Sequence, residues 1–84
     1  MKIEAKVRTV FRNTDSPLRA TVNVVFDDCF VIRNIRLIDN GNGMFVSMPS
    51  LRGSHDNWRS VCYPATRECR EQIQKAVIEA YQQA

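Results

Sequence analysis

Apolar and polar residues alternate along the first part of the chain, and this alternation predicts two β-strands. The first strand is expected to carry Ile3, Ala5, Val7, Thr9 and Phe11 on one face and Lys2, Glu4, Lys6, Arg8 and Arg12 on the other. The second is expected to carry Leu18, Ala20, Val22, Val24 and Phe26 inward and Arg19, Thr21 and Asn23 outward. A period of two separates the faces of a half-buried antiparallel strand. The turn formers of residues 13–17 separate the strands, and Asp27-Asp28 is expected to reverse the chain after them.

A third strand, from about Cys29 to Ile38, is apolar on both faces by simple alternation. Phe30 and Ile32 would face one side, and Val31, Ile35 and Leu37 the other. Apolar residues on both faces are typical of a strand in the middle of a sheet. We therefore expect this strand to lie centrally, with a helix or a partner subunit over one side.

Two Asn-Gly pairs at residues 40–43 predict a chain reversal, because Gly and Asn accept positive φ angles. The reversal leads into a short strand, Met44–Met48, which Pro49 should end because it has no backbone N–H to donate. Ser50 and Arg52 would then lie in an exposed exit loop. A further loop, Gly53–Asn57, precedes another short expected strand from Trp58 to Tyr63. The hairpin's second strand and its exit loop are the predicted working surface.

The C-terminal segment predicts one amphipathic helix. Thr66 is a suitable N-cap, and Glu68 in the first turn favours the helix dipole. Glu71 and Lys75 stand four residues apart in the favourable order for an ion pair. One apolar stripe is formed by Cys69, Ile73, Ala76, Val77 and Ala80. The expected fold is α+β: a four- to five-stranded antiparallel sheet with one C-terminal helix packed on it, as a single domain over residues 1–84.

Composition is ordinary for a small globular protein, with 44% hydrophobic and 25% charged residues. The net charge is +3, and nine of the twelve basic residues are arginine, which suits planar contacts with phosphate or carboxylate. The first residues do not form the apolar core of a secretory signal, and no apolar run approaches the roughly 20 residues of a membrane helix. We expect a cytoplasmic protein that does not interact with membranes.

Residues typical of catalysis or metal binding do not form a recognisable pattern. His55 is the only histidine and has no nucleophile at a known spacing, so an exposed loop position is the simpler interpretation. Cys29, Cys62 and Cys69 do not match the spacing of zinc ligands and are expected to be reduced, buried thiols. We therefore expect no enzyme activity, no metal, no cofactor and no small-molecule substrate.

Four arginines offer the better functional lead: Arg52, Arg59, Arg67 and Arg70. If the helix packs beside the exit loop, these side chains and the helix N-terminal amides would form a phosphate site. A solvated charged face that keeps the protein soluble explains the same pattern equally well. Trp58 and Tyr63 have the chemistry to stack on bases, although we expect Trp58 to be buried in the core.

The sequence resembles the bacterial SpoVG family of septation and sporulation regulators. The resemblance rests on Ile35–Asp39, on the run Asn42–Arg52 with its specific segment Gly43–Ser50, and on Trp58-Arg59, Tyr63-Pro64, Arg70 and Ile73-Gln74. It implies a small cytoplasmic regulator that binds DNA and RNA, and a homodimer joined through its sheets. By this match, Ser50, Arg52 and Arg70 belong to the family's nucleic-acid surface.

The chain departs from the family pattern at several positions. Leu51 replaces the first of two basic residues, Ser60 replaces the usual aspartate, and Tyr63 stands where histidine is common. Arg67 replaces a small polar residue and would restore the charge lost at Leu51. The predicted nucleic-acid contacts are Ser50, Arg52, Arg67, Arg70 and, at the edge of the patch, Lys75.

The strand after the Asn-Gly reversal offers a second, different function. An exposed strand edge can capture a partner protein by adding a strand to the sheet. The same edge can instead be covered by a second copy of the chain, and we favour this interpretation. The expected dimer interface comprises Met44, Phe45, Val46, Ser47 and Met48.

Overall fold

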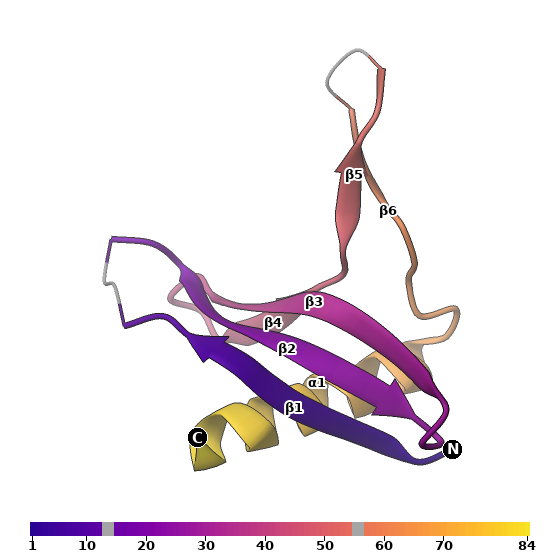
Figure 1. Cartoon of the computed structure of the whole chain (residues 1–84). Coiled ribbons are helices and arrows are strands. Elements are labelled where there is room, and N and C mark those ends of the chain that lie inside the picture. Colours follow the sequence, from indigo (N-terminus) through magenta and orange to yellow (C-terminus); the bar gives the residue numbers. More distant parts are fainter. Residues whose placement is uncertain (13–14, 55–56) are drawn as a thin grey trace.

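A computed structural model describes residues 1–12, 15–54 and 57–84, and its centre is an antiparallel sheet (Figure 1). The sheet has the strand order β1 (Ile3–Val10), β2 (Leu18–Phe26), β3 (Phe30–Asp39) and β4 (Met44–Ser47). A separate two-stranded sheet is formed by β5 (Ser50–Arg52) and β6 (Trp58–Ser60), and the helix α1 (Arg67–Gln83) follows. The predicted α+β fold is confirmed, with β3 in an inner position. None of the described helical segments is long and apolar enough to cross a membrane.

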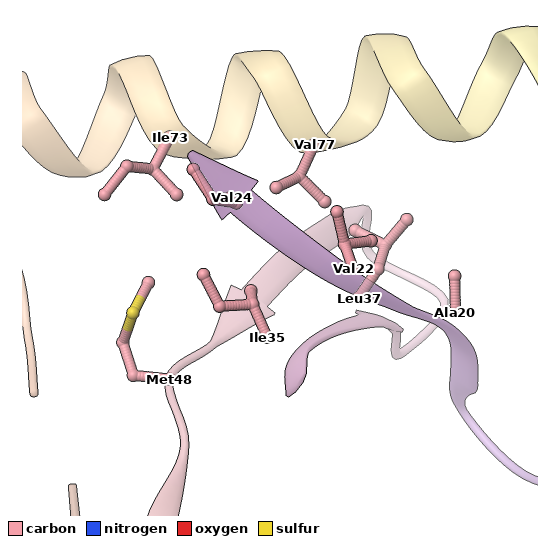
Figure 2. Close-up of a cluster of buried hydrophobic side chains, with 8 residues drawn as sticks. All are labelled: Ala20, Val22, Val24, Ile35, Leu37, Met48, Ile73 and Val77. Atoms are coloured by element: carbon pink, nitrogen blue, oxygen red, sulfur yellow. The ribbon is translucent and has the colours of Figure 1, made fainter. Parts of the chain in front are cut away.

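The hydrophobic core lies between one face of the four-stranded sheet and α1 (Figure 2). Ile73 and Val77 are the fully buried residues of the helix, and they point toward the sheet as the apolar stripe predicts. The buried core residues are Ala20, Val22, Val24, Ile35, Leu37, Met48, Ile73 and Val77. Among the described residues α1 is the only helix and it covers this face, so the opposite face of the sheet is not covered by a helix from that part of the chain.

The helix begins as the sequence predicts. Thr66 has an extended backbone, and its Oγ1 accepts a hydrogen bond from the Cys69 N–H at 3.1 Å. This bond satisfies one of the amide donors that have no partner within the helix. The predicted N-cap is confirmed.

Two predicted reversals are also confirmed. Asp27 and Asp28 have φ angles of 52° and 56°, and the Cys29 N–H donates to the Phe26 carbonyl at 3.1 Å. Positive φ at both central residues is characteristic of the tight turns that join twisted antiparallel strands. In the next reversal Gly41 and Gly43 have φ angles of 93° and 133°, a backbone region that glycine adopts without strain.

The prediction that β3 is apolar on both faces is wrong, because a bulge interrupts its alternation. The pairing register with β2 shifts between Val22 and Val24, opposite Ile35 and Ile32 respectively. Asn34 lies in this bulge with a φ of 63°, and its N–H donates to the Asn23 side chain at 3.3 Å. One extra residue moves Ile32 and Ile35 to the same face, where both pack on the core. The opposite face of the sheet is left more polar than simple alternation indicates.

A second bulge changes which residues of the first strand face the core. The register between β1 and β2 shifts between Val7 and Thr9, so Thr9 is exposed and Val10 is half-buried. Thr9 therefore does not face the core as the alternation predicts. Alternation identifies Ile3, Ala5 and Val7 correctly because these residues precede the bulge.

The segment after Pro49 differs most from the prediction. Ser50–Arg52 is a strand and not a loop, and the expected strand from Trp58 to Tyr63 ends at Ser60. These two strands pair with each other and not with the main sheet, so the main sheet has four strands, the lower number of the predicted range. Trp58 is 68% exposed, which contradicts its predicted burial in the core.

The three cysteines are free thiols, as expected, but their predicted burial is wrong. Cys29 is exposed next to the turn between β2 and β3, and Cys62 and Cys69 are partly exposed. The predicted loop histidine, His55, lies outside the described residues.

Candidate nucleic-acid interface

The β5–β6 ribbon projects from the sheet on the side opposite α1 (Figure 1). Its cross-strand pairs are Ser50 with Ser60, Leu51 with Arg59, and Arg52 with Trp58. Backbone bonds extend it at both ends, from the Gly53 N–H to the Asn57 carbonyl at 2.7 Å and from the Val61 N–H to the Pro49 carbonyl at 2.8 Å. Directly opposed residues share one face of a ribbon. The register therefore places a guanidinium and an indole side by side, at Arg52 and Trp58.

Ser50 lies at the base of this ribbon. It is half-buried, and its hydroxyl donates to the Met48 carbonyl at 3.3 Å. That bond holds the hydroxyl against its own chain where the strand leaves the sheet. Ser50 is therefore the residue at which the ribbon begins. Arg52, two residues farther along β5, is exposed.

Arg70 reaches the same region from the helix. It lines a hollow of about 210 Å³ together with Ser47, Ser60 and Tyr63. Ser60 is the cross-strand neighbour of Ser50, so the helix and the base of the ribbon meet at this hollow. One guanidinium with nearby hydroxyl groups is suited to bind a phosphate. Of the predicted contact residues, the hollow includes Arg70 but not Ser50, which reaches it only through its cross-strand neighbour Ser60.

Arg67 is the first residue of α1 and is highly exposed. Its Nε lies 3.2 Å from Glu71 Oε1, so Glu71 pairs with Arg67 in place of the predicted Lys75. Exposed pairs of this spacing contribute little, and the order with the cation N-terminal is the weaker one. Arg67 lies one turn before Arg70. Because the exposed pair with Glu71 is weak, Arg67 could exchange the Glu71 carboxylate for a phosphate at little cost in free energy.

Lys75 stands apart from this group. It lies five positions after Arg70, which corresponds to a rotation of roughly 140° around the helix. Lys75 lines a shallow hollow with Glu68, Glu71 and Gln72. The neighbouring carboxylates reduce the attraction of this position for a phosphate, so Lys75 remains a predicted contact in the least favourable surroundings.

The β4 strand forms one edge of the main sheet, as the predicted interface requires. It pairs with β3 along Met44–Ser47, and the strand order has no element beyond it among the described residues. Phe45 is 39% exposed on this strand, whereas Met48, just after it, is buried. The edge is therefore available to a further strand, although Met48 itself belongs to the core.

Sequence reasoning missed two residues that the structure places near the candidate interface. Arg36 lies on the open face of the sheet, paired across to Thr21 and Ser47. Ser60 lines the Arg70 hollow. Both positions became visible only once the bulge in β3 and the register of the ribbon were known. Within residues 1–12, 15–54 and 57–84, no group of three or more His, Cys, Asp or Glu side chains is arranged to hold a metal.

Comparison with known proteins identifies the family. The SpoVG family model matches residues 1–83. A septation protein SpoVG from Treponema denticola is 38% identical over 79 residues, covering 94% of this chain and 83% of the relative. Its counterpart in Macrococcus caseolyticus is 43% identical over 68 residues, covering 81% and 59%, and that in Acholeplasma laidlawii is 38% identical over 84 residues, covering 99% and 87%. With a match over nearly its whole length, the chain belongs to the SpoVG family.

Proposed function

We propose that this protein is a nucleic-acid-binding regulator of the SpoVG type, acting in septation, sporulation or wider gene regulation as a cytoplasmic homodimer. The observation that carries the proposal is the meeting of α1 with the base of the ribbon. There Arg70 lines a hollow together with Ser47 and Ser60. Arg67 stands one helical turn away, and Arg52 extends the basic surface along the ribbon.

A basic surface of this kind is suited to binding nucleic acid through charge more than through base sequence. Arginine contacts with phosphates fix a protein on a nucleic acid without reading its bases. Leu51 is 68% exposed at the position where the family has a basic residue. Arg67 supplies a replacement charge from the helix, so the total number of phosphate contacts is preserved while their positions change.

Dimerisation through β4 completes the proposal. The edge at Met44–Ser47 has backbone groups to share with a second β4, which would join two sheets. A domain of this size buries a modest fraction of its surface, so covering the edge also adds stability. A homodimer would present two basic surfaces to one nucleic acid.

The test is the double variant Arg67→Ala/Arg70→Ala, measured for binding to labelled duplex DNA and to single-stranded RNA across a salt titration. We expect weaker binding by a similar factor for unrelated sequences, and a log–log salt slope that becomes shallower by about 0.9 per lost contact on duplex DNA. The matched control is Arg8→Ala/Arg12→Ala, which removes the same charge from β1 and the residues after it, at the opposite edge of the sheet from β4. Equal affinities for wild type and the Arg67/Arg70 variant would refute the site.

The second candidate function is capture of a partner protein by the β4 edge without nucleic-acid binding. The exposed Phe45 on an edge strand favours it. Light scattering separates the two uses of the edge. A stable particle of twice 9.7 kDa supports a homodimer through β4, and a monomer at high concentration supports an edge kept open for another protein.

A further inference from the structure

The ribbon carries an exposed indole that the proposed arginine site does not use. Trp58 is 68% exposed, and among the described elements its strand β6 packs mainly against β5. Two-stranded ribbons are marginal in water without support from another surface. An exposed tryptophan at such a position contributes little to the fold of the single chain, which points to a ligand for its ring.

A groove lies between the ribbon and the open face of the sheet. It has a volume of about 380 Å³, within the range of small-molecule clefts. The sheet contributes Thr21, Asn34 and Arg36, and the ribbon contributes Leu51, Trp58 and Val61. The groove thus combines an aromatic wall, hydrogen-bonding side chains and one guanidinium, which are the groups that contact a base and its phosphate.

The charges around the groove favour an anionic chain. Arg36 lines it, and Arg52 is the cross-strand neighbour of Trp58 on the same face of the ribbon. None of the described lining residues is acidic. A second copy of the chain would cover Leu51 and Val61 equally well, but its approach would bring these arginines against the same arginines of the other copy.

We propose that Trp58 is a base-stacking residue for single-stranded nucleic acid, with one base in the groove and the flanking phosphates on Arg36 and Arg52. That the ligand is a nucleic acid rests on the proposed function. What this inference adds is that the groove binds single-stranded nucleic acid through an unpaired base. Bases in a duplex are stacked on each other, whereas an unpaired base has a ring face available to an aromatic side chain. The groove shares no lining residue with the hollow of Arg70, so the stacking surface is separate from the proposed phosphate contacts of Arg67 and Arg70.

The fluorescence of the protein tests this directly, because Trp58 is its only tryptophan. The probes are a 12-nucleotide oligo-U RNA, a 12-nucleotide oligo-dT DNA and a duplex of the same length. We expect the single strands to quench the emission on binding, and the duplex to bind without comparable quenching. A difference between the RNA and DNA arms identifies which single strand the groove prefers.

Variants separate stacking from simple apolar contact. Trp58→Leu is expected to weaken single-strand binding by about 5- to 150-fold, the usual effect of losing one stacked base, and Trp58→Phe should retain most of the affinity. The matched control is Phe30→Leu, an equally exposed aromatic residue at the β2–β3 turn, which should bind like wild type. Helical circular dichroism confirms that each variant is folded.

Three results would overturn the proposal, and each is distinguishable. Normal binding with no quenching and no effect of Trp58→Leu rejects stacking and leaves the Arg67/Arg70 site intact. Emission that shifts to the red on dilution of the protein alone shows that a second copy covers Trp58. No binding of any probe at low salt removes the proposed function and the stacking role together.

Discussion

The covered face of the main sheet and the separate β5–β6 ribbon contain similar apolar residues in opposite situations. On the face under α1, Val22, Val24 and Ile35 are completely buried. On the other side, Leu51 and Trp58 of the ribbon are each 68% exposed. The same hydrophobic chemistry therefore stabilises the fold on one side and remains accessible on the other. The difference indicates that the covered face sets stability, whereas the exposed apolar residues of the ribbon contribute little to it.

The largest expected effect is on stability, from Ile35→Ala in the covered face. Ile35 is fully buried in the cluster beneath α1, and truncating such a side chain leaves a cavity (Figure 2). We expect the free energy of unfolding to fall by about 2–5 kcal/mol. Urea unfolding followed by circular dichroism measures it.

The matched variant in the ribbon is Leu51→Ala, which also truncates a large apolar side chain. Because Leu51 is mostly exposed, we expect a change within about 0.5 kcal/mol. A loss of stability as large as that of Ile35→Ala would contradict the contrast between the covered face and the ribbon. It would show that Leu51 is buried in solution.

An intermediate effect on stability is expected at the bulge in β3, which determines which residues of that strand face the core. Asn34 has a φ of 63°, which a β-branched residue adopts only with strain. Asn34→Val should therefore destabilise the protein by roughly 1–2 kcal/mol, whereas Asn34→Gly should be tolerated. Thermal unfolding of the pair measures the difference. Equal melting temperatures would mean that β3 pairs without the bulge and that its faces are assigned wrongly.

A smaller effect is expected at the start of the helix that covers the sheet. Thr66→Ala removes the hydroxyl that accepts from the Cys69 N–H and should cost about 1 kcal/mol. Thr66→Ser keeps the acceptor and serves as the control. If both variants unfold like wild type, the cap does not contribute to holding α1 on the sheet.

The sequence predicts the covered face well because its signals are local. Alternation identifies the inward residues of β2, the Asp27-Asp28 turn follows from turn chemistry, and Thr66 marks the helix start. Each of these features depends on a few neighbouring residues. Long-range pairing is not needed to recognise them.

The open face is predicted poorly because it depends on register. The bulge at Asn34 changes which residues of β3 share a face, and no local pattern reveals it. The exposure of Trp58 follows from the pairing of β6 with β5 instead of the main sheet. The sequence is enough to name candidate phosphate contacts at Ser50, Arg52, Arg67 and Arg70. That Ser60 lines the same hollow as Arg70 can be seen only in the folded structure.

The most direct test of the nucleic-acid account is the affinity of the wild-type protein for duplex DNA measured across salt concentration. If each protomer of a dimer neutralises about three phosphates, the log–log slope should be near −5. A slope of that size supports an arginine surface that meets the phosphate backbone. A slope near zero, or no binding at low salt, would contradict the account and would favour a protein partner at the β4 edge.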